Sequence, residues 1–240
     1  MIQTTDKARA TYIQSVLKAA KELNPLFLIN CRIINAKAQI TFDSNWGLGS
    51  SSTLLSNVAF WANVNPFELN SLVSKGSGYD IACARSQSPI LYSMSGNQRE
   101  IKPIVYSPSF SENMYFIYLG QKQATEASIN NFFSDAIISN TDIYEISDLT
   151  YAFTACKSLY ELVRIIEIHE SLIGKVIGKE PLKSKQFSDF EGSVKSLGAW
   201  GGDFCLAVSA NDDGYVKKYF QAKGLETVLK YGEMVLLSSD

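Results

Sequence analysis

The residues best suited to chemistry lie in three glycine-rich loops, and the first of these is Gly47-Leu48-Gly49-Ser50-Ser51-Ser52. Glycine allows positive backbone φ angles and lets the main chain approach a bound anion closely. Successive backbone amides, together with the positive end of the helix that follows, can then bind phosphate oxygens. The serine hydroxyls are oxygen ligands of the kind that Mg2+ prefers. A simple turn whose serine caps the helix is the alternative, and this motif alone does not separate the two.

The second loop, Lys75-Gly76-Ser77-Gly78-Tyr79-Asp80, runs into a predicted helix and places a carboxylate at the junction. Asp80 can accept the proton of a substrate hydroxyl, or orient that hydroxyl, during phosphoryl transfer. An ordinary aspartate at a helix N-cap is the alternative.

The third loop spans residues 196–204 and has the sequence SLGAWGGDF. Its three glycines precede an apolar strand, which predicts that this backbone approaches another group closely. That group is a substrate, a nucleotide or the neighbouring subdomain, and a buried hairpin is the simpler alternative.

Composition limits the classes of function. The chain has 240 residues, of which 46% are hydrophobic and 19% are charged, the balance of an ordinary globular protein. Its net charge is −2 and it has no run of lysine or arginine, so we expect no nucleic-acid or membrane surface. Four scattered cysteines and a single histidine argue against a zinc site and favour small buried cysteines in a reducing compartment. Without a signal peptide or an apolar run of about 18 residues, a cytoplasmic location is expected.

The pattern of apolar residues predicts an α+β protein with two subdomains. Helical spacing predicts helices over residues 5–24, after the first and second loops, from Pro66, and over 124–139, most of 143–178 and 214–223. Strand composition occurs after the third loop and at 26–42, which we interpret as two strands, 89–95, 99–108, 113–120 and 227–237. Strands and helices are partly segregated along the chain, and we assign the subdomains to residues 1–110 and 111–240.

Taken together, the three loops resemble the motifs of the GHMP kinase superfamily, named for galactokinase, homoserine kinase, mevalonate kinase and phosphomevalonate kinase. Residues 47–52 match the core of its ATP-phosphate loop, although Asp43 stands where the family has a proline. By this resemblance the hydroxyl of Ser51 ligates magnesium. Residues 76–80 match the Gly-Ser-Gly-x-Asp form of the mevalonate kinase branch, which implies that Asp80 is the catalytic aspartate.

Residues 198–202 resemble the third GHMP motif, a glycine-rich turn, with Trp200 as an unusual insertion. The stretches GSGYDIACA and SLGAWGGDF are similar to those of the bacterial subgroup called GYDIA-type GHMP kinases. The implied fold is a ribosomal protein S5 domain 2-like N-terminal part, here truncated, joined to a ferredoxin-like C-terminal part. The implied cofactors are ATP and Mg2+. The implied acceptor is a small hydroxylated or phosphorylated molecule, first a mevalonate-like hydroxy acid or its phosphate and otherwise a sugar.

The resemblance also suggests further residues that contact metal, phosphate or substrate. Glu68 lies in the window where relatives carry a magnesium carboxylate, and a solvated carboxylate in the first turn of a helix is the alternative. Lys122 and Thr125 lie where relatives have a turn that faces the active cleft, with an exposed lysine as the alternative. The predicted active-site turns therefore comprise Ser77, Gly78, Lys122, Thr125, Gly198, Ala199, Gly201 and Gly202.

A GHMP kinase begins with a strand-rich segment carrying a Gly-Lys-x-x-Leu-x-Gly-Glu-type motif, which has no counterpart in this sequence. A start codon assigned too late, a fragment and a truncated gene are the three explanations. Because missing strands would expose sheet edges and apolar faces, we expect homodimerisation or poor solubility. The hypothesis that competes with an active kinase is a non-catalytic remnant that binds nucleotide or is purely structural.

Three other residues have simpler interpretations. His169 lies at helical spacing with Leu162 and Ile166, so we expect it to pack on a helix face rather than act as a catalyst. Trp61 is expected in the core, and Trp46 either flanks the nucleotide or belongs to the core.

Overall fold

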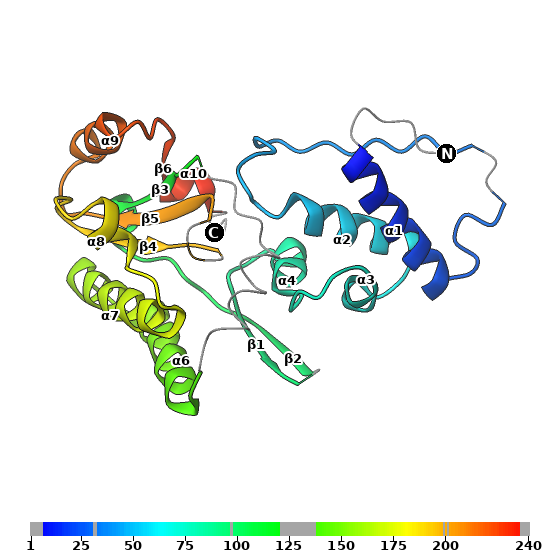
Figure 1. The fold of residues 1–240 in the computed structure, drawn as a ribbon, viewed down its shortest axis with the longest axis horizontal. Coiled ribbons are helices and arrows are strands. Elements are labelled where there is room, and N and C mark those ends of the chain that lie inside the picture. Colours follow the sequence, from blue (N-terminus) through cyan, green and yellow to red (C-terminus); the bar gives the residue numbers. More distant parts are fainter. Residues whose placement is uncertain are drawn as a thin grey trace. The chain divides into compact units, whose positions relative to one another are not determined.

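The computed structural model describes residues 7–30, 33–96, 98–120, 138–198, 200 and 202–235. The chain forms two compact units. Unit 1 comprises Met1–Ser44 and Leu48–Val105, and unit 2 comprises Asn45–Gly47 and Tyr106–Asp240. Helices and strands are both present, so the predicted α+β class is confirmed (Figure 1).

The described part of unit 1 contains four helices and one hairpin. These elements are α1 (Lys7–Leu23), α2 (Ser50–Ala62), α3 (Pro66–Val73), α4 (Tyr79–Arg85), β1 (Ile90–Ser95) and β2 (Gln98–Pro103). Helix α2 packs against α1, α3 and α4, and its Leu55 and Ala59 are fully buried among them. The side-chain amide of Asn24 donates to the carbonyl of Ala62 at 2.8 Å and connects the end of α1 to the end of α2.

The two strands expected within residues 26–42 are not found in the described part of that segment. Residues 33–42 belong to no ladder, and the side chain of Ile33 is 85% exposed. Apolar and β-branched residues supply a preference for extended backbone, but a strand also needs a neighbouring strand to satisfy its amides and carbonyls. Among the described residues, none pairs with this segment, and the prediction of two strands is wrong there.

Unit 2 is built on a four-stranded antiparallel sheet with the spatial order β4-β5-β3-β6. Its elements are η1 (Ser111–Asn113), β3 (Met114–Tyr118), α6 (Asn140–Ala155), α7 (Leu159–Ile177), α8 (Leu182–Gln186), β4 (Ser193–Ser196), β5 (Phe204–Val208), α9 (Asp213–Ala222), β6 (Val228–Lys230) and α10 (Tyr231–Met234). The sequence of strands and helices and the strand order are those of a ferredoxin-like sheet, as the resemblance implied.

Helices cover both faces of this sheet (Figure 1). Val194 and Ile117 lie in one core with Phe220 of α9, whereas Leu206 lies in a second core with Ile166 of α7. This division follows the strand pleat, because alternate residues of β3, β4 and β5 point to opposite faces.

Two sequence predictions for unit 2 are not confirmed. The strand expected over residues 227–237 ends at Lys230, where the backbone amide of Lys230 donates to the Glu233 carboxylate at 2.6 Å and the chain turns into α10. The helix expected over 124–139 lies almost wholly outside the described residues.

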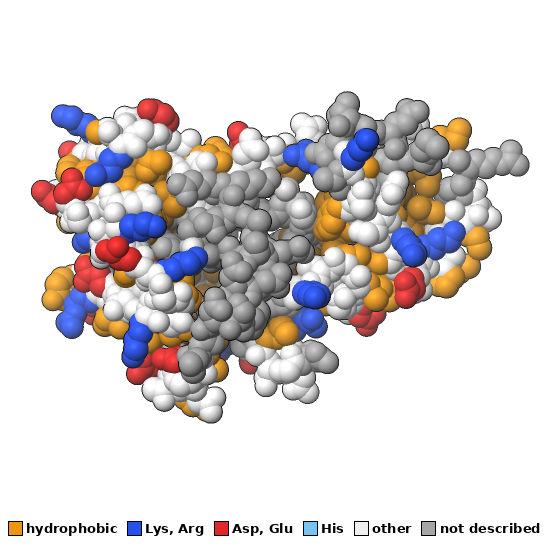
Figure 2. All heavy atoms as spheres, in the orientation of Figure 1, with side chains coloured by type: hydrophobic (Ala, Val, Ile, Leu, Met, Phe, Trp, Pro, Cys, Tyr) orange, Lys and Arg blue, Asp and Glu red, His pale blue; other side chains and the backbone are white. Residues whose placement is uncertain are grey.

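The surface in Figure 2 shows lysine and arginine side chains interspersed with aspartate and glutamate. Within the described residues, no helix combines the length and the apolar character needed to cross a membrane.

The residue directly before β4 is a glycine that lies close to β5. A Cβ atom at Gly192 would lie 2.1 Å from the backbone carbonyl oxygen of Val208 on β5. We therefore expect Gly192→Ala to lower the free energy of unfolding by about 2–3 kcal/mol and Tm by about 4–12 °C, measured by thermal denaturation. Gly214→Ala, at the start of α9, is the matched control and should leave Tm nearly unchanged; equal effects of the two substitutions would contradict the sheet contact.

Candidate functional site

The N-terminus of α2 has no side-chain cap. Its N-cap residue is Gly49, in the left-handed region at φ 72° and ψ 28°, and its first turn contains no acidic residue. By contrast, side chains of Asn65, Ser139, Ser158 and Asp212 cap α3, α6, α7 and α9. The first amides of a helix have no intrahelical acceptor, so those of α2 are free to bind an anion. The alternative in which a serine caps this helix is wrong, because glycine occupies the cap.

Three consecutive serines follow that cap. In the described part of the structure, the hydroxyls of Ser50, Ser51 and Ser52 take part in no hydrogen bond, and Ser51 is exposed. The backbone of the turn is nevertheless fixed, because Thr53 donates to the Gly49 carbonyl from its amide at 2.9 Å and from its hydroxyl at 3.1 Å. The first turn of α2 therefore offers both free amides and free hydroxyls at a defined place.

The start of the first loop is anchored within unit 2. The Trp46 ring lies 5.7 Å from the Phe204 ring, edge to face, and the Tyr118 hydroxyl donates to the Asn45 carbonyl at 3.0 Å. A Cβ atom on Gly47, whose φ is 64°, would lie 1.6 Å from a carboxylate oxygen of Asp203. Gly47 and the end of the third loop are therefore in direct contact. The Oδ1 atom of Asp203 is buried and has no hydrogen-bond partner among the residues that the structure describes.

Asp80 lies one residue inside the N-terminus of α4. The N-cap is Gly78, with φ 86°, so the alternative in which the aspartate caps this helix is wrong. The Asp80 side chain reaches solvent and, among the described residues, makes no hydrogen bond or ion pair. Partial burial by its surroundings raises the pKa of Asp80 above the ordinary value, without help from a charged partner. An unpaired carboxylate with a raised pKa has the properties of a general base.

The second loop also contains residues that the sequence did not identify as functional. The Ser77 hydroxyl accepts the backbone amide of Tyr79 at 3.3 Å, which makes its side chain part of the turn itself. The Ser77 carbonyl accepts hydrogen bonds from Tyr92 and Arg99 of the β1–β2 hairpin. No sequence motif marks these two residues, which lie 15 and 22 positions beyond Ser77.

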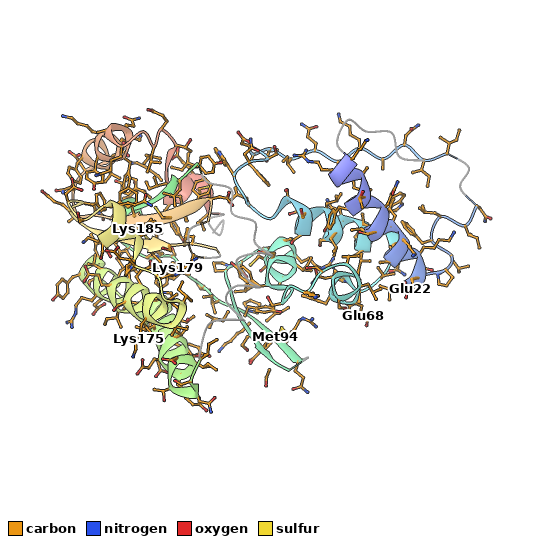
Figure 3. All side chains as sticks on the ribbon, viewed as in Figure 1. Glu22, Glu68, Met94, Lys175, Lys179 and Lys185 are labelled. Carbon is orange, nitrogen blue, oxygen red and sulfur yellow. The ribbon has the colours of Figure 1, made fainter. Side chains whose placement is uncertain are left out.

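Unit 1 brings the first turn of α2 and the loop of Asp80 into one packed body. Ile81, directly after Asp80, is buried in the same core as Leu55 of α2. Glu68 is not brought to Ser51 by any recorded contact. It lies exposed in α3, which follows the C-terminal end of α2 (Figure 3). Ser51 lies in the first turn of α2, 11 residues or about 16 Å from Ala62 along the helix axis.

The third loop connects β4 to its antiparallel neighbour β5 and is therefore a hairpin loop. A hairpin was the simpler of the two interpretations of its sequence. Gly198 has φ 61°, Trp200 adopts an unusual φ of 54°, and Gly202 is buried. Lys122, Thr125, Ala199 and Gly201 lie outside the described residues.

The described residues contain no group of three histidine, cysteine, aspartate or glutamate side chains that could hold a metal ion. Mg2+ does not require such a cage, because it keeps several waters and is completed by substrate phosphates. A free serine hydroxyl beside a helix N-terminus whose first amides are free, as at Ser51, fits this kind of site.

Comparison with solved structures identifies the fold. Streptococcus pneumoniae phosphomevalonate kinase, solved in complex with phosphomevalonate and AMPPNP, matches with a TM-score of 0.68 and 15% sequence identity over 95% of this chain and 83% of that chain. L. major mevalonate kinase, in complex with R-mevalonate, matches at 0.57 and 14% over 94% of this chain and 78% of that chain. Lactococcus lactis galactokinase, complexed with galactose, matches at 0.54 and 14% over 96% and 77%.

This chain has the GHMP kinase fold. At sequence identities this low, the likeness establishes the fold and leaves activity and substrate to be argued from the site. No family model matches the sequence, and no curated protein matches it either.

The raised pKa of Asp80 predicts a stability effect with a definite sign. The folded protein binds the Asp80 proton more tightly than the unfolded chain does, so this group favours folding at acidic pH and loses that contribution as pH rises through the raised pKa. We therefore expect Asp80→Asn to raise Tm at pH 7, by an amount that vanishes near pH ~4, the ordinary range of aspartate. Asp148→Asn, on the exposed side of α6, is the control for charge removal, and a Tm for Asp80→Asn below that of the unsubstituted protein at pH 7 would contradict the assignment.

Proposed function

We propose that this protein is an ATP-dependent small-molecule kinase that transfers a phosphoryl group to a hydroxyl or phosphate of a mevalonate-like metabolite. One observation carries the proposal: the uncapped N-terminus of the 13-residue helix α2 and the unpaired Asp80 carboxylate at the start of α4 belong to one packed body. The first is suited to hold phosphate and the second to receive a proton. The GHMP kinase fold supports the same reaction class.

The residues have distinct roles in this proposal. The amides of the first turn of α2, which follows Gly49, bind phosphate oxygens of the nucleotide, and the hydroxyl of Ser51 provides a ligand for Mg2+. When bound, Mg-ATP supplies the phosphoryl group and neutralises negative charge. As the acceptor oxygen would bond to the γ-phosphorus, the bond from that phosphorus to the ADP oxygen would break and ADP would leave. Asp80 accepts the proton that an acceptor hydroxyl loses, or orients that hydroxyl. The protein's contribution is mainly positioning and electrostatic stabilisation.

The choice of acceptor rests on the second loop. The form GSGYD is similar to that of GYDIA-type and mevalonate-type kinases, and a solved structure with the same fold holds phosphomevalonate. We therefore place a hydroxy acid of the mevalonate type, or its phosphate, first. A sugar such as galactose, which the galactokinase structure binds, is second.

A charge placed at the N-terminus of α2 tests phosphate binding without relying on turnover. Mg-ATP at a concentration one hundredfold above Kd should stabilise the protein by about 2.7 kcal/mol. Ser51→Asp adds a negative charge that interacts favourably with the helix dipole, so the free protein should gain about 0.3–1 kcal/mol, while stabilisation by Mg-ATP should disappear. Thermal denaturation with and without Mg-ATP measures both effects.

Asn57→Asp places the same charge in the middle of α2 and is the control, expected to retain the Mg-ATP shift. A wild-type protein without any shift, or a Ser51→Asp protein with the full shift, would refute nucleotide binding at this helix.

The catalytic role of Asp80 predicts that a substitution at this residue strongly lowers turnover but leaves nucleotide binding intact. Asp80→Asn should lower kcat by about 10²–10⁴-fold, because it removes the proton acceptor, while the thermal shift caused by Mg-ATP persists. In the unsubstituted enzyme kcat should fall on acidification at a pH above the ordinary aspartate pKa of about 3.9, since the base works only when ionised. The assay measures ADP release with mevalonate, phosphomevalonate and galactose as acceptors, and Asp148→Asn is the control.

The same assay separates the kinase from the non-catalytic alternative. A protein that is stabilised by Mg-ATP but phosphorylates none of these acceptors would favour a nucleotide-binding remnant. One that shows neither property would favour a purely structural role.

A further inference from the structure

The loop that precedes Asp80 is held by side chains from three other elements of unit 1. The amide group of Asn70, buried in α3, donates to the Gly76 carbonyl at 3.3 Å. The next carbonyl along the chain, that of Ser77, accepts two hydrogen bonds from the β1–β2 hairpin. Tyr92 donates to it from its hydroxyl at 2.6 Å and Arg99 from its Nε atom at 3.2 Å.

Tyr92 and Arg99 reach the same carbonyl because the hairpin register puts them on one face. Tyr92 pairs with Ile101, two residues from Arg99 on β2, so the two side chains are diagonal neighbours. Met94, labelled on β1 in Figure 3, is the direct register partner of Arg99. An isolated two-stranded hairpin is marginally stable in water. The contacts of β1 and β2 with this loop therefore stabilise the hairpin as well as the loop.

The Arg99 side chain is itself fixed by an aromatic ring. Its guanidinium carbon lies 5.2 Å from the centre of the Phe67 ring of α3, a cation–π distance. Within the described residues, its two terminal nitrogens make no hydrogen bond or ion pair. Arg99 therefore connects α3, the hairpin and the loop: its guanidinium lies over the Phe67 ring of α3, and its Nε atom donates to the loop.

Gly78 completes the enclosure of the loop. A Cβ atom there would lie 3.0 Å from Cδ1 of Phe67 and 3.5 Å from Nε of Arg99, and the residue has φ 86°. The Tyr79 ring also contacts the Tyr92 ring, edge to face, with 6.0 Å between centres. The backbone between Ser77 and the first turn of α4 is thus confined on several sides.

We propose that Arg99, assisted by Tyr92, is a positioning residue for Asp80. Its hydrogen bond to the Ser77 carbonyl sets where α4 begins, and the start of α4 fixes the direction of the Asp80 carboxylate three residues further on. A hydrogen bond from a charged donor is stronger than a neutral one, which suits a residue that must restrain a glycine-rich turn. This inference rests on the proposed function, because it assigns Arg99 a role in the same reaction.

The test compares Arg99→Ala, Arg99→Lys and Tyr92→Phe with Lys102→Ala, which removes a cation from the opposite face of β2. Arg99→Ala should lower kcat by about tenfold or more while KM for ATP changes less than about twofold, since small displacements of a reacting group are costly. Arg99→Lys, which keeps a charged donor, should recover part of the loss. Tyr92→Phe should have a smaller effect, and Lys102→Ala none.

Amide hydrogen exchange of a peptide covering residues 74–82 provides the readout that does not depend on turnover. Exchange should accelerate in Arg99→Ala and Tyr92→Phe, with Tm nearly unchanged, because the loop loosens locally. Unchanged exchange in Arg99→Ala would overturn the contact. Faster exchange with wild-type kcat would overturn the positioning role while leaving the proposed function intact. Absence of phosphoryl transfer in the unsubstituted protein would instead refute the proposed function.

Discussion

Unit 1 depends on the packing of α2 against three other helices. Leu55, Val58 and Ala59 are buried against α1, α3 and α4, and this burial fixes the axis of the helix. A buried leucine or valine contributes about 1.5–3 kcal/mol, whereas a glycine N-cap in place of a serine or aspartate costs only a few tenths of a kcal/mol. The core therefore more than offsets an uncapped terminus. The result is a rigid helix whose first amides are available to a ligand rather than used by the fold.

Among the described residues, several polar groups that the fold leaves unpaired lie in the three loops. They include the first amides of α2, the Asp80 carboxylate, Oδ1 of Asp203 and Nε1 of Trp200. Outside the loops, the Tyr106 hydroxyl and Oδ1 of Asp213 also have no hydrogen-bond partner among the described residues. Both carboxylate oxygens of buried Glu170 lack hydrogen bonds there too, but one lies 3.6 Å from the Lys195 ammonium. Unpaired polar groups without such compensation reduce stability, and natural proteins retain them chiefly where function requires them.

Local signals predicted the elements and the loops, whereas contacts between distant segments were not predictable. Clustered glycines and serines predict the first two loops, and apolar residues at helical spacing predict α1, α2 and α3. The strand prediction is wrong for the described part of residues 26–42, because composition indicates a preference for extended backbone and not the presence of a neighbouring strand. We expect Trp61 in the core, yet it is 45% exposed, and its ring lies 5.0 Å from the ring of buried Phe27. The support that Arg99 gives to Ser77 depends on hairpin register, which no local pattern encodes.

The first loop shows how one motif can contain two unrelated requirements for glycine. Gly49 has no atom within 4 Å of the place where a Cβ would stand, so only its φ of 72°, needed to start α2 without a side-chain cap, calls for glycine. Gly47 is different, because a Cβ there would collide with the Asp203 carboxylate of unit 2. One glycine thus serves the open helix terminus and the other a close contact with the third loop. The loop is tightly held at its first glycine and open at its second, the arrangement a phosphate-binding turn needs when its position must be fixed but its amides must stay free.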